Sequence, residues 1–174
     1  MKKIIIIVAI AILGSCKALD KLTMFNLKYD TKFTLPANNI VGRPIDLTSP
    51  EMTTNTEEEF AIHDTRKDLI EEIKLKELTL TIENRAQTFD FLESVTVYIT
   101  AEGLPEIKVA EKLSVPKDIQ NELKLDVFDD DLAPYLKKEK IAMRVITVAD
   151  GAVTEDLAIN LHSVFRVDAK ILGL

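Results

Sequence analysis

The chain has few of the residues on which many protein functions depend. Its 174 residues include one cysteine, no tryptophan, two histidines and five glycines. A single cysteine cannot form a disulfide within the chain, so the fold must be stable without one. Without tryptophan, and with only three tyrosines, the chain offers little aromatic surface on which a sugar could stack. Basic residues are in the minority, and the formal net charge of −7 argues against nucleic acid as a partner.

The small number of histidines also restricts catalysis. A catalytic triad requires three converging groups, and the chain contains no G-x-S-x-G nucleophile elbow around its serines. We expect His162 on the solvent face of the last strand, as a surface or cross-strand histidine, and we assign no catalytic role to His63. Carboxylates at 57–59 and 71–72 could supply the paired acids of a glycoside hydrolase, but their presence is adequately explained if they lie on solvent-exposed faces. The sequence therefore predicts no enzyme.

Acidic side chains are densest at Asp126, Asp129, Asp130 and Asp131. Oxygen ligands of this kind can bind Ca²⁺, which makes these four residues the weak metal candidates of the chain. Their spacing departs from D-x-[DN]-x-[DN]-G, and no glycine supplies the required turn. The competing interpretation is a solvated loop whose last aspartate caps a helical turn at Leu132. We predict no cofactor and no assigned metal site.

The first sixteen residues have a pattern of their own. Two lysines precede the apolar stretch at 4–13, and small residues follow it. A charged start, an apolar stretch and small residues before a cleavage point are typical of a secretory signal peptide. A ten-residue helix spans about 15 Å, or half of a ~30 Å hydrocarbon core. The segment is therefore too short for a permanent membrane span.

The sequence Leu13-Gly14-Ser15-Cys16 resembles the lipobox of bacterial lipoproteins. In that family a diacylglycerol thioether forms on the cysteine, the preceding peptide is removed and the new amino terminus is usually acylated. The resemblance implies that Leu13 occupies the apolar position, that Gly14 and Ser15 precede the cut, and that Cys16 is the lipid acceptor. Two or three acyl chains suffice for stable anchoring. The alternative, an ordinary signal peptide with a chance cysteine, leaves the position of Cys16 unexplained.

Apolar and polar residues alternate along most of the remaining chain. Leu27, Phe33 and Leu35 are separated by polar residues, and Thr31 fills a missing apolar position. This period of two predicts half-buried β-strands. Strands are predicted at 25–35, 75–82, 95–100, 107–109, 123–127, 141–146 and 157–171, with an edge strand or crossing loop at 40–47.

Helical patterns are confined to short stretches. Residues 64–73 predict a helix capped by Asp64, and a single turn is expected around 132–136. A slip in the apolar phase predicts a bulge near 76–77. About seven or eight strands with one or two short helices predict a mainly β fold, an antiparallel β-sandwich of immunoglobulin-like architecture. An up-and-down barrel is the alternative, because alternation does not reveal whether a sheet closes.

The chain resembles small lipoproteins of Bacteroidota that carry one β-sandwich domain after a lipobox. The resemblance rests on LGSC, FNLKYDTKFTLP, ELTLTIENRAQTFDFLESVTVYITAEGLPEIKVA and FRVDAKIL. It implies no activity and no functional residue other than Cys16. Surface-exported members typically carry an acidic cluster after the cysteine, whereas residues 17–20 contain one acid. We therefore expect an outer-membrane lipoprotein that faces the periplasm.

These observations predict three parts of the chain. Residues 1–15 form a signal peptide that is removed, residues 16–22 form the lipidated cysteine and a short tether, and residues 23–174 form a single β-sandwich domain. A tether of six residues reaches about 20 Å when fully extended. The domain is therefore expected to lie close to the membrane.

Three functions are compatible with this organisation. The first is a non-catalytic interaction module, attached to the membrane by its lipid, that contacts an envelope protein. The second is a carrier that holds an apolar ligand or lipid between its sheets, which requires a cavity of ~300–1,000 Å³. The third is a hydrolase that uses the acidic clusters, which requires facing carboxylates, or an acid and a histidine, in a cleft. Phe89 and Phe91 would either plug one end of the sandwich or form an exposed contact patch.

Overall fold

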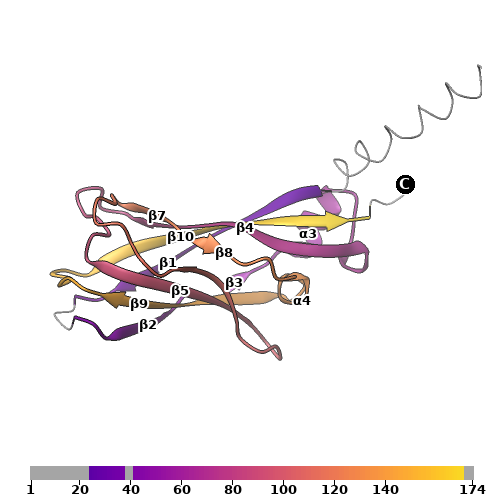
Figure 1. Ribbon diagram of the computed structural model, residues 1–174. Helices are drawn as coiled ribbons and strands as arrows, with labels where there is room; N and C mark the ends of the chain where they lie inside the picture. Colours follow the sequence, from indigo (N-terminus) through magenta and orange to yellow (C-terminus); the bar gives the residue numbers. More distant parts are fainter. Residues whose placement is uncertain (1–23, 38–40, 171–174) are drawn as a thin grey trace, which may run out of the picture.

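The structure, a computed structural model, describes residues 24–37 and 41–170 (Figure 1). Two antiparallel sheets pack face to face, which confirms the predicted sandwich rather than one closed sheet. The first sheet has the order β1 (Met24–Leu35), β10 (Leu157–Ala169), β4 (Ile70–Ile82) and β7 (Glu122–Lys124). The second has the order β2 (Pro44–Thr48), β9 (Lys140–Ala149), β5 (Leu92–Ala101), β6 (Ile107–Lys112) and β8 (Asp126–Val127), and β3 (Met52–Thr53) also pairs with β9.

The alternating pattern produces the core directly. Along β1, Leu27, Thr31, Phe33 and Leu35 are buried, and the residues between them are exposed or half-buried. β10 alternates in the same way over its whole length and pairs with β1 residue by residue from Met24 to Leu35. The inner faces of both sheets therefore form one continuous apolar core.

One end of the sandwich is closed by aromatic side chains. Phe89 is fully buried and Phe91 is half-buried, with ring centroids 6.4 Å apart. The plug predicted from the sequence is therefore confirmed for Phe89. The predicted bulge is also confirmed, because the pairing of β4 with β10 skips Lys76 between Leu75 and Glu77.

The predicted helix over 64–73 is wrong. The helix α3 (Thr56–Ile62) lies earlier, a short 3₁₀ turn η1 (Lys67–Leu69) follows, and β4 begins at Ile70. Asp64 is not a cap: it has φ +52°, a left-handed conformation that cannot continue a helix. Ile70 and Ile73 are buried in β4 against β10, so sheet pairing overrides their helical spacing.

The predicted strand at 123–127 divides between the two sheets. Its first part is β7, which pairs with β4, and its second part is β8, which pairs with β6. Leu125 lies at the crossing, is buried, and donates its backbone N–H to the Leu78 carbonyl at 3.0 Å. The described chain therefore contains ten strands rather than seven or eight.

The shorter predictions have mixed outcomes. β2 is an edge strand as expected, although it begins at Pro44, and Ile40 lies outside the described residues. The expected helical turn is α4 (Ala133–Leu136). The predicted signal peptide, with Leu13, Gly14, Ser15 and Cys16, also lies outside the described residues. In the described ranges, no helix has the length and apolar character needed to span a bilayer.

Candidate functional site

Three adjoining hollows lie at the end of the sandwich that carries α3. The largest, which we call the end groove, has a volume of about 740 Å³. A second of about 300 Å³ shares Glu139 and Lys140 with it, and a third of about 330 Å³ shares Thr53, Thr54 and Asn55 with the second. The end groove is lined by Glu51, Thr100, Ala101, Glu102, Lys137, Lys138, Glu139, Lys140, Ile141 and Ala142.

The segment around Thr54 fixes the position of the groove. The Thr54 hydroxyl donates to the Lys138 carbonyl at 2.6 Å, and its backbone N–H donates to the Glu139 carbonyl at 2.9 Å. The Tyr29 hydroxyl donates to the Thr54 carbonyl at 2.6 Å. Burial, with the nearby Glu59 charge, raises the pKa of Tyr29, so its hydroxyl remains a donor at neutral pH. Through these hydrogen bonds, the segment holds β1 and the residues just before β9 together.

The other wall of the groove is held by α4. The Asp131 carboxylate accepts from the backbone N–H groups of Ile73, at 3.1 Å, and Ala133, at 3.0 Å. The Tyr135 hydroxyl donates to the Pro105 carbonyl at 2.6 Å, which ties α4 to the connection between β5 and β6. Burial, followed by the Asp130 charge, raises the pKa of Tyr135. The backbone that carries the groove is thus held by partly buried hydrogen bonds from side chains.

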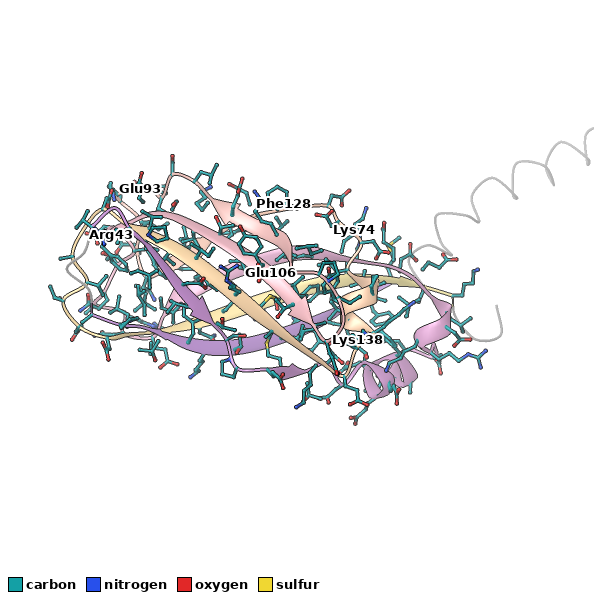
Figure 2. The ribbon with its side chains drawn as sticks, turned by 90° about the horizontal axis from the view of Figure 1, so that it is seen from below. Arg43, Lys74, Glu93, Glu106, Phe128 and Lys138 are labelled. Carbon is teal, nitrogen blue, oxygen red and sulfur yellow. The ribbon has the colours of Figure 1, made fainter. Side chains whose placement is uncertain are left out.

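The charges in the groove are mixed. Lys140 pairs with Glu51 at 3.0 Å, and this hydrogen bond raises the pKa of Lys140. The Lys137 ammonium donates to the Ile70 carbonyl at 3.2 Å. Within the part of the chain that the structure describes, the Lys138 side chain has no ion pair. Figure 2 shows Lys138 at this end and Arg43 at the other. The groove can hold polar or charged groups, and its lining contains no histidine.

The structure separates the four predicted metal candidates. Asp126 pairs with Lys112 at 3.2 Å, Asp129 pairs with Lys74 at 3.1 Å, and Asp130 is exposed. Asp131 accepts hydrogen bonds at the start of α4, close to the capping role expected for it. Among the described residues, no group of three or more His, Cys, Asp or Glu side chains is arranged to hold a metal ion.

The residues weighed for catalysis lie outside the end groove. His162 Nδ1 and Asp30 Oδ1 form a hydrogen bond of 2.8 Å on the outer face of the first sheet, which confirms a cross-strand histidine. His63 stacks on Phe25 with centroids 4.0 Å apart. Of the acidic runs, the three members that form ion pairs do so with lysines: Glu57 with Lys67, Glu71 with Lys170 and Glu72 with Lys74.

The hollows are also unlike the cavity that a carrier requires. They open at the surface and are lined largely by polar residues, whereas the apolar faces of the two sheets pack against each other. The end groove cannot be recognised in the sequence, because its residues come from three separate parts of the chain. The one local signal is the charged run Lys137-Lys138-Glu139-Lys140 between α4 and β9.

No family model matches the sequence, and no curated protein matches it. The structure is similar to N-glycanase F, with a TM-score of 0.46 and 11% identity over 86% of this chain, which spans 43% of that chain. It is also similar to the Caldicellulosiruptor saccharolyticus module CBM27-1, solved with mannohexaose, with a TM-score of 0.40 and 10% identity over 80% of this chain and 74% of that one. These similarities are too distant to bear on function.

Proposed function

We propose that this chain is a lipid-anchored, non-catalytic binding module of the bacterial cell envelope, which contacts an envelope protein through its end groove. The observation that supports this proposal is the position of the groove relative to the start of the domain. The third hollow, which shares Thr53, Thr54 and Asn55 with the second, is also lined by Asn26, Leu27, Lys28 and Tyr29 of β1. The groove therefore lies at the end from which the chain leads back to Cys16.

The distance to the anchor is short. Residues 17–23 separate Cys16 from Met24, and these eight Cα–Cα steps reach at most about 29 Å when fully extended. An acylated Cys16 would therefore hold the groove end of the sandwich near the bilayer surface. A partner bound there would be a component of the membrane surface or a protein attached to it. The single acid in residues 17–20 supports the periplasmic face of the outer membrane.

A binding role is also supported by the chemistry of the groove. Its walls are held by partly buried hydrogen bonds from side chains to the backbone, and its lining contains no histidine, cysteine or serine. Lys137 and Lys138 form no ion pair in the described residues, but Lys137 donates to the Ile70 carbonyl, so Lys138 is the groove cation available to a carboxylate of a partner. Such a contact would be a charge-assisted hydrogen bond, one of the stronger polar contacts in proteins.

The anchor is tested by metabolic labelling with an alkyne-tagged fatty acid. The wild-type chain should incorporate the label and lose residues 1–15, and Cys16→Ala should remain unlabelled. An unlabelled wild-type chain whose mass still includes Met1 would overturn the anchor.

The groove is tested by quantitative cross-linking in envelope membranes. Lys138→Glu should abolish the cross-linked product that the wild type forms, because it reverses the charge of the groove lysine that has neither an ion pair nor a carbonyl partner in the described residues. Lys76→Glu is the matched control, since Lys76 is exposed at the β4 bulge and does not line the groove. A product that both variants form equally well would place the partner elsewhere.

A further inference from the structure

Large apolar side chains are exposed at both ends of the sandwich. Among the described residues they are Met24, 40% exposed, Val41, 50%, Ile62, 67%, and Leu113, 64%. Met24 and Ile62 lie at the end that carries α3. Val41 and Leu113 follow β1 and β6 at the opposite end. Ile62 is the most exposed of the four, although Phe60 in the same helix is fully buried.

The turn after Ile62 holds both ends of the described domain together. His63 stacks on Phe25, next to the start of β1, with ring centroids 4.0 Å apart. The Thr65 hydroxyl donates to the Lys170 carbonyl at 2.6 Å, and the Lys170 backbone N–H donates to the Leu69 carbonyl at 2.9 Å. Ile62 therefore lies beside the point from which the chain leads to Cys16. Figure 1 shows α3 next to the end of β10.

The length of chain outside the structure limits where this end can be. Eight Cα–Cα steps separate Cys16 from Met24, which allows at most about 29 Å between them when the chain is fully extended. With Cys16 acylated in a bilayer, the α3 end is the part of the described domain that lies nearest to the lipid. Val41 and Leu113 are then held away from it by the length of the sandwich.

The charges around the turn are paired with one another. Lys67 pairs with Glu57 at 2.9 Å, Arg66 with Asp68 at 2.7 Å, and Lys170 with Glu71 at 3.1 Å. Among the described residues, this turn therefore has no excess of cations that would attract anionic lipid. A contact with lipid here would therefore be apolar and independent of lipid charge.

We propose that the α3 end of the sandwich rests on the lipid surface, with the Ile62 side chain inserted at the level of the headgroups. The proposal rests on the proposed function, because the acylated Cys16 brings this end to the membrane. One inserted isoleucine is too weak to attach a protein by itself, so the contact sets the orientation of the domain and the acyl chains provide attachment. The end groove is thereby held beside the bilayer.

The single cysteine of the chain allows a direct test. In the lipidated protein Cys16 is blocked, so Ile62→Cys introduces one free thiol for an environment-sensitive fluorophore. Leu113→Cys is the matched control, since its side chain is equally exposed at the opposite end. Both proteins are reconstituted in phosphatidylcholine vesicles that contain nitroxide-labelled lipid, and circular dichroism and thermal unfolding verify that both variants fold.

We expect the probe at position 62 to shift to the blue and to lose emission by nitroxide quenching. The probe at position 113 should behave as it does without vesicles. Equal signals from both positions, in protein that floats with the vesicles, would overturn the orientation and leave the anchor intact. Wild-type protein that does not float with the vesicles would overturn the anchor and the orientation with it.

Discussion

The two ends of this sandwich differ in how they are closed. At the end opposite α3, the connections 83–91, 113–121 and 150–156 bring side chains together: Phe89 is fully buried, and the Lys117 ammonium donates to the carbonyls of Asp90, at 2.7 Å, and Leu92, at 3.1 Å. The hollow described at that end has a volume of about 90 Å³. At the α3 end, two of the connections between strands contain the short helices α3 and α4, and the end groove of about 740 Å³ remains open there.

The comparison shows which connections leave room for a ligand. Each of the three connections at the closed end contributes a buried side chain, Phe89, Val115 or Val153, that covers the end of the core. At the α3 end, the connection between β3 and β4 is longer and contains a helix, which packs against the core through only part of its surface. Thr56 and Phe60 of α3 are buried, whereas Glu57, Glu58, Ala61 and Ile62 are exposed. The closed end therefore serves stability, and the α3 end provides the accessible surface.

The largest expected effect comes from removing one aromatic anchor at each end. Phe89→Ala and Phe60→Ala should each lower the free energy of unfolding by about 3–5 kcal/mol, because both side chains are fully buried. Chemical denaturation measures the loss. Hydrogen exchange should distinguish the two variants, since only Phe60→Ala should expose the amides of α3. Equal exposure of α3 in both variants would contradict the independence of the two ends.

Replacing a buried threonine by valine should have opposite effects on the free energy of unfolding at the two ends of the sandwich. Thr54→Val removes the buried hydroxyl that donates to the Lys138 carbonyl at 2.6 Å, and should cost about 1–3 kcal/mol. It should also reduce cross-linking at the groove. Thermal unfolding and the cross-linking assay measure the two effects. Unchanged stability would show that this hydrogen bond does not hold the groove.

Thr147→Val is the counterpart towards the closed end. Thr147 Oγ1 is buried and has no hydrogen-bond partner within the described residues. Replacing the hydroxyl by a methyl group removes the cost of burying an unpaired polar group, so the free energy of unfolding should rise by about 1 kcal/mol. Chemical denaturation of the variant beside the wild type measures this gain. A decrease in stability would mean that the hydroxyl has a partner in solution.

The smallest expected effect concerns β2, between the two ends. Arg144 donates to both carboxylate oxygens of Asp46, at 2.9 Å and 2.7 Å, and to Glu106 at 2.6 Å. The hydrogen bond from Arg144 holds the pKa of Asp46 below its ordinary value. The ion pair therefore stabilises the folded state at neutral pH, and its contribution is lost as the pH falls through the lowered pKa.

Hydrogen exchange of the β2 amides should accordingly accelerate at acidic pH, beyond the intrinsic pH dependence of exchange. Asp46→Asn should accelerate the exchange already at neutral pH and remove this additional pH dependence. β1 amides serve as the internal reference, because β1 belongs to the other sheet. The same pH dependence in Asp46→Asn as in the wild type would assign the effect to another group.

Most of the strands could be predicted from the sequence, because the exposure of each residue in a half-buried strand follows its own polarity. Thr31 and the bulge at Lys76 were both visible as interruptions of the period of two. The region 64–73 could not be predicted in this way. Its apolar residues satisfy a helical spacing, but pairing with β10 buries Ile70 and Ile73 as strand residues.

The end groove could not be predicted either. Its lining comes from the end of β5, from Glu51 and from the run that begins β9, and no local pattern relates these segments. The closed end was easier to anticipate, since Phe89 and Phe91 are adjacent to the strand that they cap. Short-range features of this kind are visible in a sequence, whereas a surface hollow depends on where distant connections meet.

The sequence by itself determined the alternation that makes this chain a β-sandwich, because side-chain polarity and strand geometry share a period of two residues. It also determined the LGSC motif, from which the anchor is proposed, because that pattern is continuous along the chain. The tertiary structure alone decided how 123–127 divides between two sheets and which end of the sandwich carries a groove. These features depend on contacts between residues far apart in the chain, and each residue's own polarity is compatible with several such arrangements.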